Sequence, residues 1–208
     1  MPTPLAPALK MLVQTTQKTY TPQEYRLSEE TAEFRSEYHD GEIVAIAGGT
    51  INHNRIIGNI YAYLKSALRG KNAEAFMNDL RLWIPQYSRG TYPDIMVISG
   101  NPIFIEGRVD EVLNPVLIVE VIWKSTQEFD RNDKFRLYRS LPEFREYLLV
   151  DRYQFLVQQY IKNESRQWLF QEFETETDSI SLTSLGVEFS LADIYEGVQF
   201  VSVTESQA

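Results

Sequence analysis

The sequence predicts a single domain of mixed helix and strand, in the α/β (α+β) class. Its 208 residues, 43% of them apolar, suffice for one sizeable core, and single domains of this length are ordinary. Two apolar runs rich in Val and Ile, residues 92–98 and 114–122, are typical of strands buried on both faces. Residues 51–68 carry apolar side chains at helical spacing with a polar opposite face, which predicts an amphipathic helix.

We expect the folded domain to span residues 20–195, with a flexible leader over residues 1–19 and a tail over residues 196–208. The first ten residues contain three prolines and lack the long apolar core of a signal peptide, and no run approaches about 18 consecutive apolar residues. These features predict a soluble, cytoplasmic protein with no membrane contact. The chain has no cysteine, which excludes disulfides, thiolate zinc sites and a cysteine nucleophile.

Capping and turn residues predict the N-terminal elements. Thr21-Pro22-Gln23-Glu24 is a capping box with proline at the first helical position, so a short helix should run to about Thr31. The Asp40-Gly41 pair between alternating segments predicts a hairpin over residues 34–46. Gly48-Gly49-Thr50 then breaks the chain before the amphipathic helix.

The rest of the chain predicts further strands around the two apolar runs. Residues 99–114 contain Gly100, Pro102 and Gly107 and are too short for a long crossover helix, so we expect an irregular loop there. A helix capped by Ser125 or Thr126 should follow the second apolar run. Strands are expected over residues 73–77, 80–85, 145–151, 155–162 and 167–174, and a short helix over residues 189–195.

Each apolar run carries one carboxylate, Asp94 in the first and Glu120 in the second. A carboxylate on a buried strand needs a partner because burial removes its solvation. A divalent cation is one such partner, since Mg²⁺ is held by one or two carboxylates plus waters. The helix after the second run brings Lys134 back toward the end of the Glu120 strand, which makes these three residues the candidate site.

Each candidate also has a structural interpretation. Asp94 could cap a turn, Glu120 could pair with Lys134 or an arginine, and Lys134 could be the i to i+4 partner of Asp130. His53 at the start of the long helix is an accessory candidate, although most lone histidines are structural or surface residues.

Other polar residues are weaker candidates. Glu37 and Glu42 flank the hairpin turn and are candidate outer ligands. The net charge of −9 and the pI near 4.8 argue against a broad electrostatic footprint on nucleic acid. A local basic rim could still contact phosphates, although the same charges also suit a solvated helix face. This rim, residues 124–139, carries Lys124, Arg131, Lys134, Arg136 and Arg139.

A series of motifs runs through the chain: Tyr38 to Val44, Gly48-Gly49-Thr50 through His53, Tyr92-Pro93-Asp94, Leu117 to Ile122, Lys124-Ser125-Thr126, Asp130-Arg131, Lys134, Tyr138 and Glu146 to Asp151. This series resembles the Uma-two family of "putative restriction endonucleases", a family of unknown function assigned to the PD-(D/E)XK nuclease superfamily. The resemblance covers roughly residues 20–195. It implies a restriction-endonuclease-like fold with a central mixed sheet flanked by helices, an N-terminal hairpin, C-terminal antiparallel strands and often a homodimer.

The resemblance implies a metal-dependent endonuclease acting on DNA. Asp94 and Glu120 would then hold Mg²⁺ or Mn²⁺, and the carbonyl of Val121 would complete the ligand set. A standard (D/E)-x-K motif has its lysine at the position held here by Ile122, and the resemblance suggests that the lysine has moved to the next helix, as Lys134.

One position departs from the family pattern. The family usually has serine where this chain has Trp123, and an indole there could narrow the site, stack on a base or mark an inactive copy. Ser125 and Asp130 remain accessory candidates, and Lys124, Arg131 and Arg136 are the candidate nucleic-acid contacts. Two alternatives to the nuclease stay open: an inactive nuclease-fold module that binds nucleic acid, and a domain that binds a small molecule or a protein in the same pocket.

Overall fold

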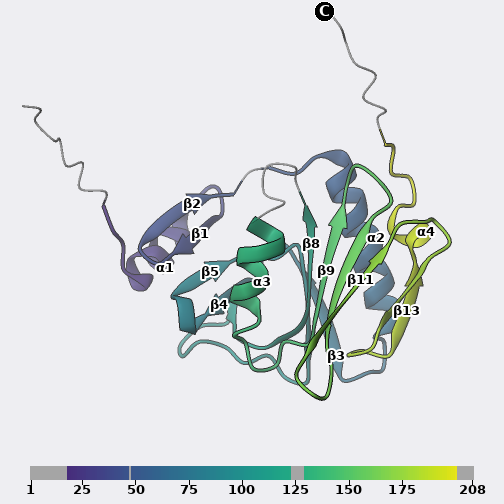
Figure 1. The fold of residues 1–208 in the computed structure, drawn as a ribbon. Coiled ribbons are helices and arrows are strands. Elements are labelled where there is room, and N and C mark those ends of the chain that lie inside the picture. The colour runs from purple at the N-terminus through teal and green to yellow at the C-terminus, as the bar shows by residue number, and fades with distance from the viewer. Residues whose placement is uncertain (1–17, 47, 123–128, 201–208) are drawn as a thin grey trace, which may run out of the picture.

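The described part of the chain folds into two large sheets, a two-stranded ribbon and four α-helices (Figure 1). The structure is a computed structural model and describes residues 18–46, 48–122 and 129–200. A six-stranded sheet forms the centre, and α2 (Ile51–Ala67) covers one of its faces. A five-stranded sheet and α3 (Phe135–Tyr138) lie toward the opposite face. None of the helices in the described ranges is long and apolar enough to cross a membrane.

The six-stranded sheet is mixed, as predicted. Strands β8 and β9 are parallel, and every other neighbouring pair is antiparallel. All eight residues of β8 and all six of β9 are buried, because helices or strands cover both faces at the centre of the sheet. The strand order is β11 (Trp168–Phe173), β10 (Val157–Lys162), β9 (Glu146–Asp151), β8 (Pro115–Ile122), β6 (Ile95–Ser99) and β3 (Ala73–Met77).

The five-stranded sheet contains the predicted hairpin. Asp40 and Gly41 form its turn with positive φ angles of 47° and 106°, the left-handed conformation that a two-residue hairpin turn requires. The strand order is β2 (Glu42–Ala45), β1 (Ser36–His39), β5 (Arg89–Thr91), β4 (Arg81–Ile84) and β7 (Glu111–Val112).

Strand β7 corrects the expectation that residues 99–114 are wholly irregular. It pairs in parallel with β4, and a two-residue strand is too short to show alternation in the sequence. Its Glu111 is fully buried and accepts hydrogen bonds from Arg81 at 2.7 Å and Arg26 at 2.7 Å. The ion pairs of Glu111 therefore hold β7 to Arg81 of β4 and to Arg26.

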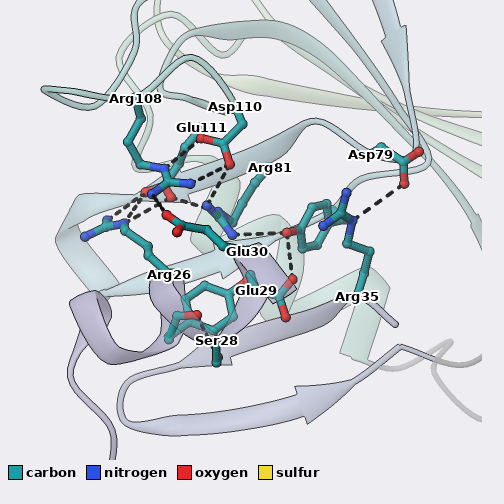
Figure 2. Close-up of polar contacts among 12 residues, drawn as sticks. Arg26, Ser28, Glu29, Glu30, Arg35, Asp79, Arg81, Arg108, Asp110 and Glu111 are labelled. Carbon is teal, nitrogen blue, oxygen red and sulfur yellow. Dashed lines mark hydrogen bonds and ion pairs between the residues drawn. The ribbon is translucent and has the colours of Figure 1, made fainter. Parts of the chain in front are cut away.

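A network of charged side chains attaches α1 (Pro22–Thr31) to this sheet (Figure 2). The helix begins with the predicted capping box at Thr21 and Glu24. Arg81, 1% exposed, lies between Glu111 and the hydroxyl of Tyr92, which in turn donates to Glu29. The network therefore fixes the chain two residues before Asp94.

The core has two main parts, one on each face of the six-stranded sheet. On one face, α2 packs against the sheet through Ile56, Ile57, Ile60, Leu64 and Leu68. On the other face, apolar side chains of β4, β6, β8, β9 and α3 meet, among them Leu82, Ile84, Met96, Ile118, Ile122, Phe135 and Tyr138.

The C-terminal region contains a two-stranded ribbon that was not among the predicted elements. Strands β12 (Ser179–Leu182) and β13 (Val187–Ser190) pair with each other and precede α4 (Leu191–Ile194), which lies within the predicted short helix. Residues 196–200, expected in the tail, pack against the domain. The ring of Phe200 meets that of Phe155 edge to face at 5.0 Å between centroids, and the Asn52 side chain donates to the carbonyl of Gln199.

Candidate active site

Asp94 and Glu120 lie side by side at one end of the six-stranded sheet. Ile95 of β6 is opposite Val119 of β8 in antiparallel register, which places Asp94 opposite Glu120. Asp94 was expected inside a strand, but β6 begins only at Ile95. The reason is that the side chain of Asp94, rather than its backbone, continues the ladder: Oδ2 accepts a hydrogen bond of 2.7 Å from the N–H of Val121.

This hydrogen bond also indicates where the Val121 carbonyl points. The N–H and C=O of one strand residue point to the same side of the strand. Since the Val121 N–H points to Asp94, its carbonyl also faces the side of β8 on which Asp94 lies. Asp94, Glu120 and the Val121 carbonyl thus surround the end of β6.

Lys134 and Tyr138 reach Glu120 from the helix that follows β8. The Nζ of Lys134 lies 3.1 Å from Oε1 of Glu120 and 3.3 Å from Oδ1 of Asp130. The hydroxyl of Tyr138 donates a hydrogen bond of 2.6 Å to the same Oε1 of Glu120. The four side chains are almost completely enclosed, with exposed fractions of 15% for the Lys134 side chain and 6% for those of Glu120 and Asp130.

The electrostatics of this group follow from burial. Burial raises the pKa of Glu120 to about 8, and the charges of Asp94 and Asp130 act in the same direction while Lys134 opposes them. Burial alone would lower the pKa of Lys134, but Glu120, Glu37 and Asp130 raise it well above its ordinary value. Lys134 is therefore a permanent cation, whereas Glu120 can hold a proton near neutral pH.

The segment that carries Lys134 begins as a π-helix, Phe129–Lys134, and continues as α3. Phe135, Leu137 and Tyr138 are buried while Arg136 and Arg139 are exposed. Short π-helical segments often occur at functional sites. The predicted helix start near Thr126 lies outside the described residues, as do the candidates Trp123, Lys124 and Ser125.

His53 approaches Asp94 from the start of α2. Its Nε2 lies 3.3 Å from Oδ1 of Asp94, and its side chain is 12% exposed. Thr50 caps the helix by accepting a hydrogen bond from the His53 N–H. A β-carbon on Gly49 would lie only 3.0 Å from Nδ1 of His53, so the glycine leaves the space that the imidazole occupies.

A second polar group faces the site from the five-stranded sheet. Oε1 of Glu37 accepts a hydrogen bond from the Thr91 hydroxyl. Its other oxygen, Oε2, lies 2.7 Å from Nε2 of His39. Burial opposes its charge, but these hydrogen bonds and the charge of Lys134 outweigh burial and lower the pKa of Glu37 to about 2. Glu42, by contrast, is exposed at the hairpin turn.

Sequence reasoning did not anticipate three of these contacts, namely those of Tyr138, His39 and Thr91. Tyr138 lies one helical turn after Lys134, so helical spacing alone would place the two on one face. His39 lies two residues after Glu37 on the same strand, so the two side chains point to one face. The contact of Thr91 with Glu37 joins β5 to β1 and leaves no signal in the sequence.

The two described candidates for nucleic-acid contact, Arg131 and Arg136, each bond a polar side chain. The Nε of Arg131 donates to Gln158 on β10 at 2.8 Å. The Arg136 side chain is 60% exposed and pairs with Asp133 at 3.4 Å.

The donor set at the site fits a hard cation better than zinc. Within the described ranges, no three or more His, Cys, Asp or Glu side chains gather closely enough to hold a metal ion by themselves. Two carboxylates and one backbone carbonyl, completed by waters, are instead the kind of set that binds Mg²⁺. The residues present thus fit a magnesium or manganese ion.

Comparison with known proteins gives three kinds of match. The model of the Uma2 family, described as "Putative restriction endonuclease", matches residues 22–193. Two uncharacterised proteins of Synechocystis sp. (strain ATCC 27184 / PCC 6803 / Kazusa) are similar. One, sll1609, is 40% identical over 177 residues, covering 85% of this chain and all of the relative. The other, slr1290, is 33% identical over 180 residues, covering 86% of this chain and 93% of the relative.

A crystal structure shares the fold. It is that of a putative nuclease belonging to DUF820 from Anabaena variabilis ATCC 29413, with a TM-score of 0.69 over 85% of this chain and 97% of that chain. The sequence identity is 20%, so this match is evidence for the architecture. The restriction-endonuclease-like fold expected from the sequence agrees with it.

Proposed function

The chain belongs to the Uma2 family of nuclease-like proteins, and on that basis we propose that it is a metal-dependent endonuclease that hydrolyses DNA phosphodiester bonds. Asp94, Glu120 and Lys134 are the proposed catalytic residues. The proposal depends above all on one observation. Asp94 lies opposite Glu120 across two neighbouring strands, and the amine of Lys134, from the following helix, lies 3.1 Å from Glu120.

Asp94, Glu120 and the Val121 carbonyl would hold Mg²⁺ or Mn²⁺. When bound, the ion supplies Lewis-acid chemistry that polarises the scissile phosphate and lowers the pKa of the attacking water. The Val121 N–H holds Oδ2 of Asp94, and the other oxygen, Oδ1, lies 3.3 Å from Nε2 of His53. Glu120 must lose any proton it carries before it can act as a ligand.

Lys134 supplies the permanent positive charge of the site. Its amine would stabilise negative charge that develops on the phosphate oxygens as the attacking water adds. Asp130 holds the amine at 3.3 Å and Tyr138 fixes the Glu120 carboxylate at 2.6 Å, so both act as positioning residues. His53, held against Asp94, is an accessory residue that orients this carboxylate or the attacking water.

A second candidate function is a nucleic-acid-binding module on the same fold that does not cleave. The observation that favours it is Ile122, which is buried at the position where a (D/E)-x-K motif carries its lysine. The bulky Trp123 next to it favours the same alternative. Homodimer formation, which the family resemblance implied, stays a prediction that light scattering after gel filtration can check.

Nicking of supercoiled plasmid DNA with Mg²⁺ or Mn²⁺ at low salt tests the proposal. Wild-type protein should convert supercoiled to nicked circles, and chelation of the metal should stop the reaction. Asp94→Asn, Glu120→Gln and Lys134→Met should each abolish nicking, because each removes one proposed catalytic group. The matched control is Glu143→Gln, since Glu143 is an exposed glutamate paired with Arg145 at 3.8 Å.

The same experiment separates the two candidates. Wild-type protein that binds DNA with a salt-dependent affinity but does not nick it, under any of these conditions, is a binding module. If nicking persists in all three site variants, the activity does not belong to this site.

A further inference from the structure

The six-stranded sheet ends at β11, and no other strand of the described residues pairs with the outer edge of this strand. The Asn163 N–H donates a hydrogen bond of 2.9 Å to the carbonyl of Gln167, so the backbone groups of Gln167 face β10. Because backbone groups point to alternate sides along a strand, those of Trp168, Phe170 and Glu172 face away from β10. These three residues thus present N–H and C=O groups along the outer edge of the sheet.

The side chains of β11 do not protect this edge. Natural proteins shield edge strands with lysine, proline, bulges or a short length. All six residues of β11 pair with β10 without a bulge, and Glu172 is its one charged residue. Oε1 of Glu172 accepts a hydrogen bond of 2.6 Å from Gln158, so this carboxylate is turned back toward β10. Leu169 and Phe170, 50% and 49% exposed, are left for a partner to cover.

Phe170 ends a row of aromatic rings that begins in the core. Its ring centroid lies 5.0 Å from that of Tyr160 on β10, and the Tyr160 centroid lies 4.4 Å from that of Phe135 on α3. Phe135 belongs to the buried cluster that also contains Tyr138, and Tyr160 packs against that cluster. An aromatic ring placed against Phe170 from outside would extend the same packing.

The turn before β11 forms a basic end of the strand. Lys162 and Arg166 lie on either side of this turn. Burial and the charges of Arg145 and Arg166 lower the pKa of Lys162, and Glu143 acts in the opposite direction. Three cations therefore lie near one another at this end. Glu164, at the tip of the turn, is the one acidic residue within it.

The other end of β11 is acidic. Residues 167–208 contain no lysine or arginine, and Glu172, Glu174 and Glu176 follow one another at alternate positions. Arg166 and Glu174, which flank the strand, are both exposed. A strand with one basic and one acidic end is complementary to a second copy of itself in antiparallel orientation, because each acidic end then lies beside a basic end.

We propose that two copies of this chain associate through β11, which pairs antiparallel with β11 of the second copy about a two-fold axis at Phe170. The two six-stranded sheets then form one continuous sheet. The inference goes beyond the proposed function and does not depend on it.

Symmetry sets the register of this pairing. The two-fold axis is perpendicular to the sheet, so residues that lie opposite each other share a face. Centring the axis on Phe170, the middle one of the three outward-facing residues, allows all of their N–H and C=O groups to pair. Phe170 then lies opposite Phe170 of the second copy, Trp168 opposite Glu172, and Arg166 opposite Glu174.

Light scattering after gel filtration tests the association, and sedimentation equilibrium gives its Kd. Wild-type protein should have twice the chain mass of 24.2 kDa. Phe170→Lys places two like charges opposite each other at the axis, so it should weaken association by at least about tenfold. Phe34→Lys is the matched control, because Phe34 is 73% exposed and lies outside β11. It should leave the Kd unchanged.

Charge reversal tests whether the partner is a second copy in this orientation. Glu174→Arg and Arg166→Glu each place like charges opposite each other twice per dimer, so each should weaken association by about tenfold. The double variant restores opposite charges and should return the Kd to within about twofold of wild type. Additive weakening in the double variant would contradict the pairing of Arg166 with Glu174.

A single introduced thiol tests the register, since the chain has no cysteine of its own. In Phe170→Cys the two α-carbons would lie about 5.5 Å apart, within the range that a disulfide spans. Mild oxidation should therefore link this variant into a covalent dimer. In Glu172→Cys the two thiols would be offset by four residues, about 13 Å, and should not link.

Two results overturn the inference. One is a wild type that stays monomeric at its highest soluble concentration. The other is a dimer whose Kd is the same in Phe170→Lys, with circular dichroism showing that the variant is folded. If Phe170→Lys does not fold, failure of Phe170→Cys to form the covalent dimer overturns it instead. None of these measurements involves DNA, so each leaves the proposed function intact.

Discussion

The Nζ of Lys134 lies 3.1 Å from Oε1 of Glu120, although the lysine comes from a helix and the glutamate from a strand. Oδ1 of Asp130, on the same helix, lies 3.3 Å from the same amine. The arrangement gives the site a lysine beside its glutamate without a lysine in β8, where Ile122 instead joins the apolar core.

Replacement of this lysine should remove both activity and stability. Lys134→Met keeps most of the side-chain volume but leaves the carboxylates without their cation, so nicking should fall by at least about 100-fold. The unfolding free energy should fall by about 3 kcal/mol, as when one partner of a buried ion pair is removed. Plasmid nicking and urea denaturation measure the two effects. Lys65→Met is the control, because Lys65 pairs with Glu74 at the surface and its loss should cost less than about 1 kcal/mol.

Glu120 should make the metal-free protein less stable as pH rises. Its pKa is raised to about 8 when folded, against an ordinary value near 4.5, so the folded state binds the extra proton between these values. Stability from this group is thus full below about pH 4.5 and is lost by about pH 8, at no more than about 1.4 kcal/mol per pH unit. The glutamine of Glu120→Gln cannot titrate, so the unfolding free energy of this variant should rise relative to that of wild type as pH increases from about 4.5 to about 8. Urea denaturation in a chelator measures the difference, and parallel pH profiles would contradict the prediction.

Mg²⁺ should stabilise the wild-type protein through Asp94. A ligand that binds only the folded state at 100 times its Kd adds about 2.7 kcal/mol, so the melting temperature should rise with Mg²⁺ concentration. Asp94→Asn preserves an oxygen that can accept the Val121 hydrogen bond but removes the charge, so it should lose this dependence while staying folded. Scanning calorimetry with and without Mg²⁺ provides the measurement. An equal rise in the variant would place the ion elsewhere.

Two adjacent glycines test the role of His53. In Gly49→Ala the new methyl group would lie 3.0 Å from Nδ1 of His53 and push the imidazole away from Asp94. In Gly48→Ala the methyl group would meet nothing within 4 Å. Nicking should therefore fall by about tenfold or more in Gly49→Ala and stay unchanged in Gly48→Ala, as expected for loss of a group that orients the site. Equal rates in both would make His53 a neighbour without a role.

Gly90 and Gly58 should respond in opposite directions to alanine. At Gly90 the added methyl group would lie 3.2 Å from the Tyr25 ring in a packed cluster, so the substitution should destabilise the protein by about 1 to 3 kcal/mol. Gly58 lies inside α2 with open space around it, so alanine there should stabilise the protein by up to about 1 kcal/mol. Thermal denaturation of both variants checks the pair. A gain in stability for Gly90→Ala would show that β5 can shift away from the aromatic cluster.

Local chemistry was enough to predict most helices and strands. The capping box at Thr21, the Asp40-Gly41 turn and the spacing of apolar residues in α2 each act within a few residues of the chain. Strand β7 and the β12–β13 ribbon were missed, and β12 and β13 are no shorter than the predicted strands β1, β2 and β4. A two-residue strand such as β7 is too short to show the alternation of apolar and polar residues that predicts a strand.

The sequence by itself determined that this chain is acidic and without cysteine, with one carboxylate in each of two apolar runs and a lysine in the segment that follows. Only the tertiary structure decided how these groups meet. Asp94 bonds the Val121 N–H because β6 begins one residue after it, and Tyr138 reaches Glu120 because α3 packs across β8. The placement of Glu37 beside Lys134 depends on one sheet packing against another. Such contacts join residues far apart in the chain, and their energies depend on burial, which no local pattern encodes.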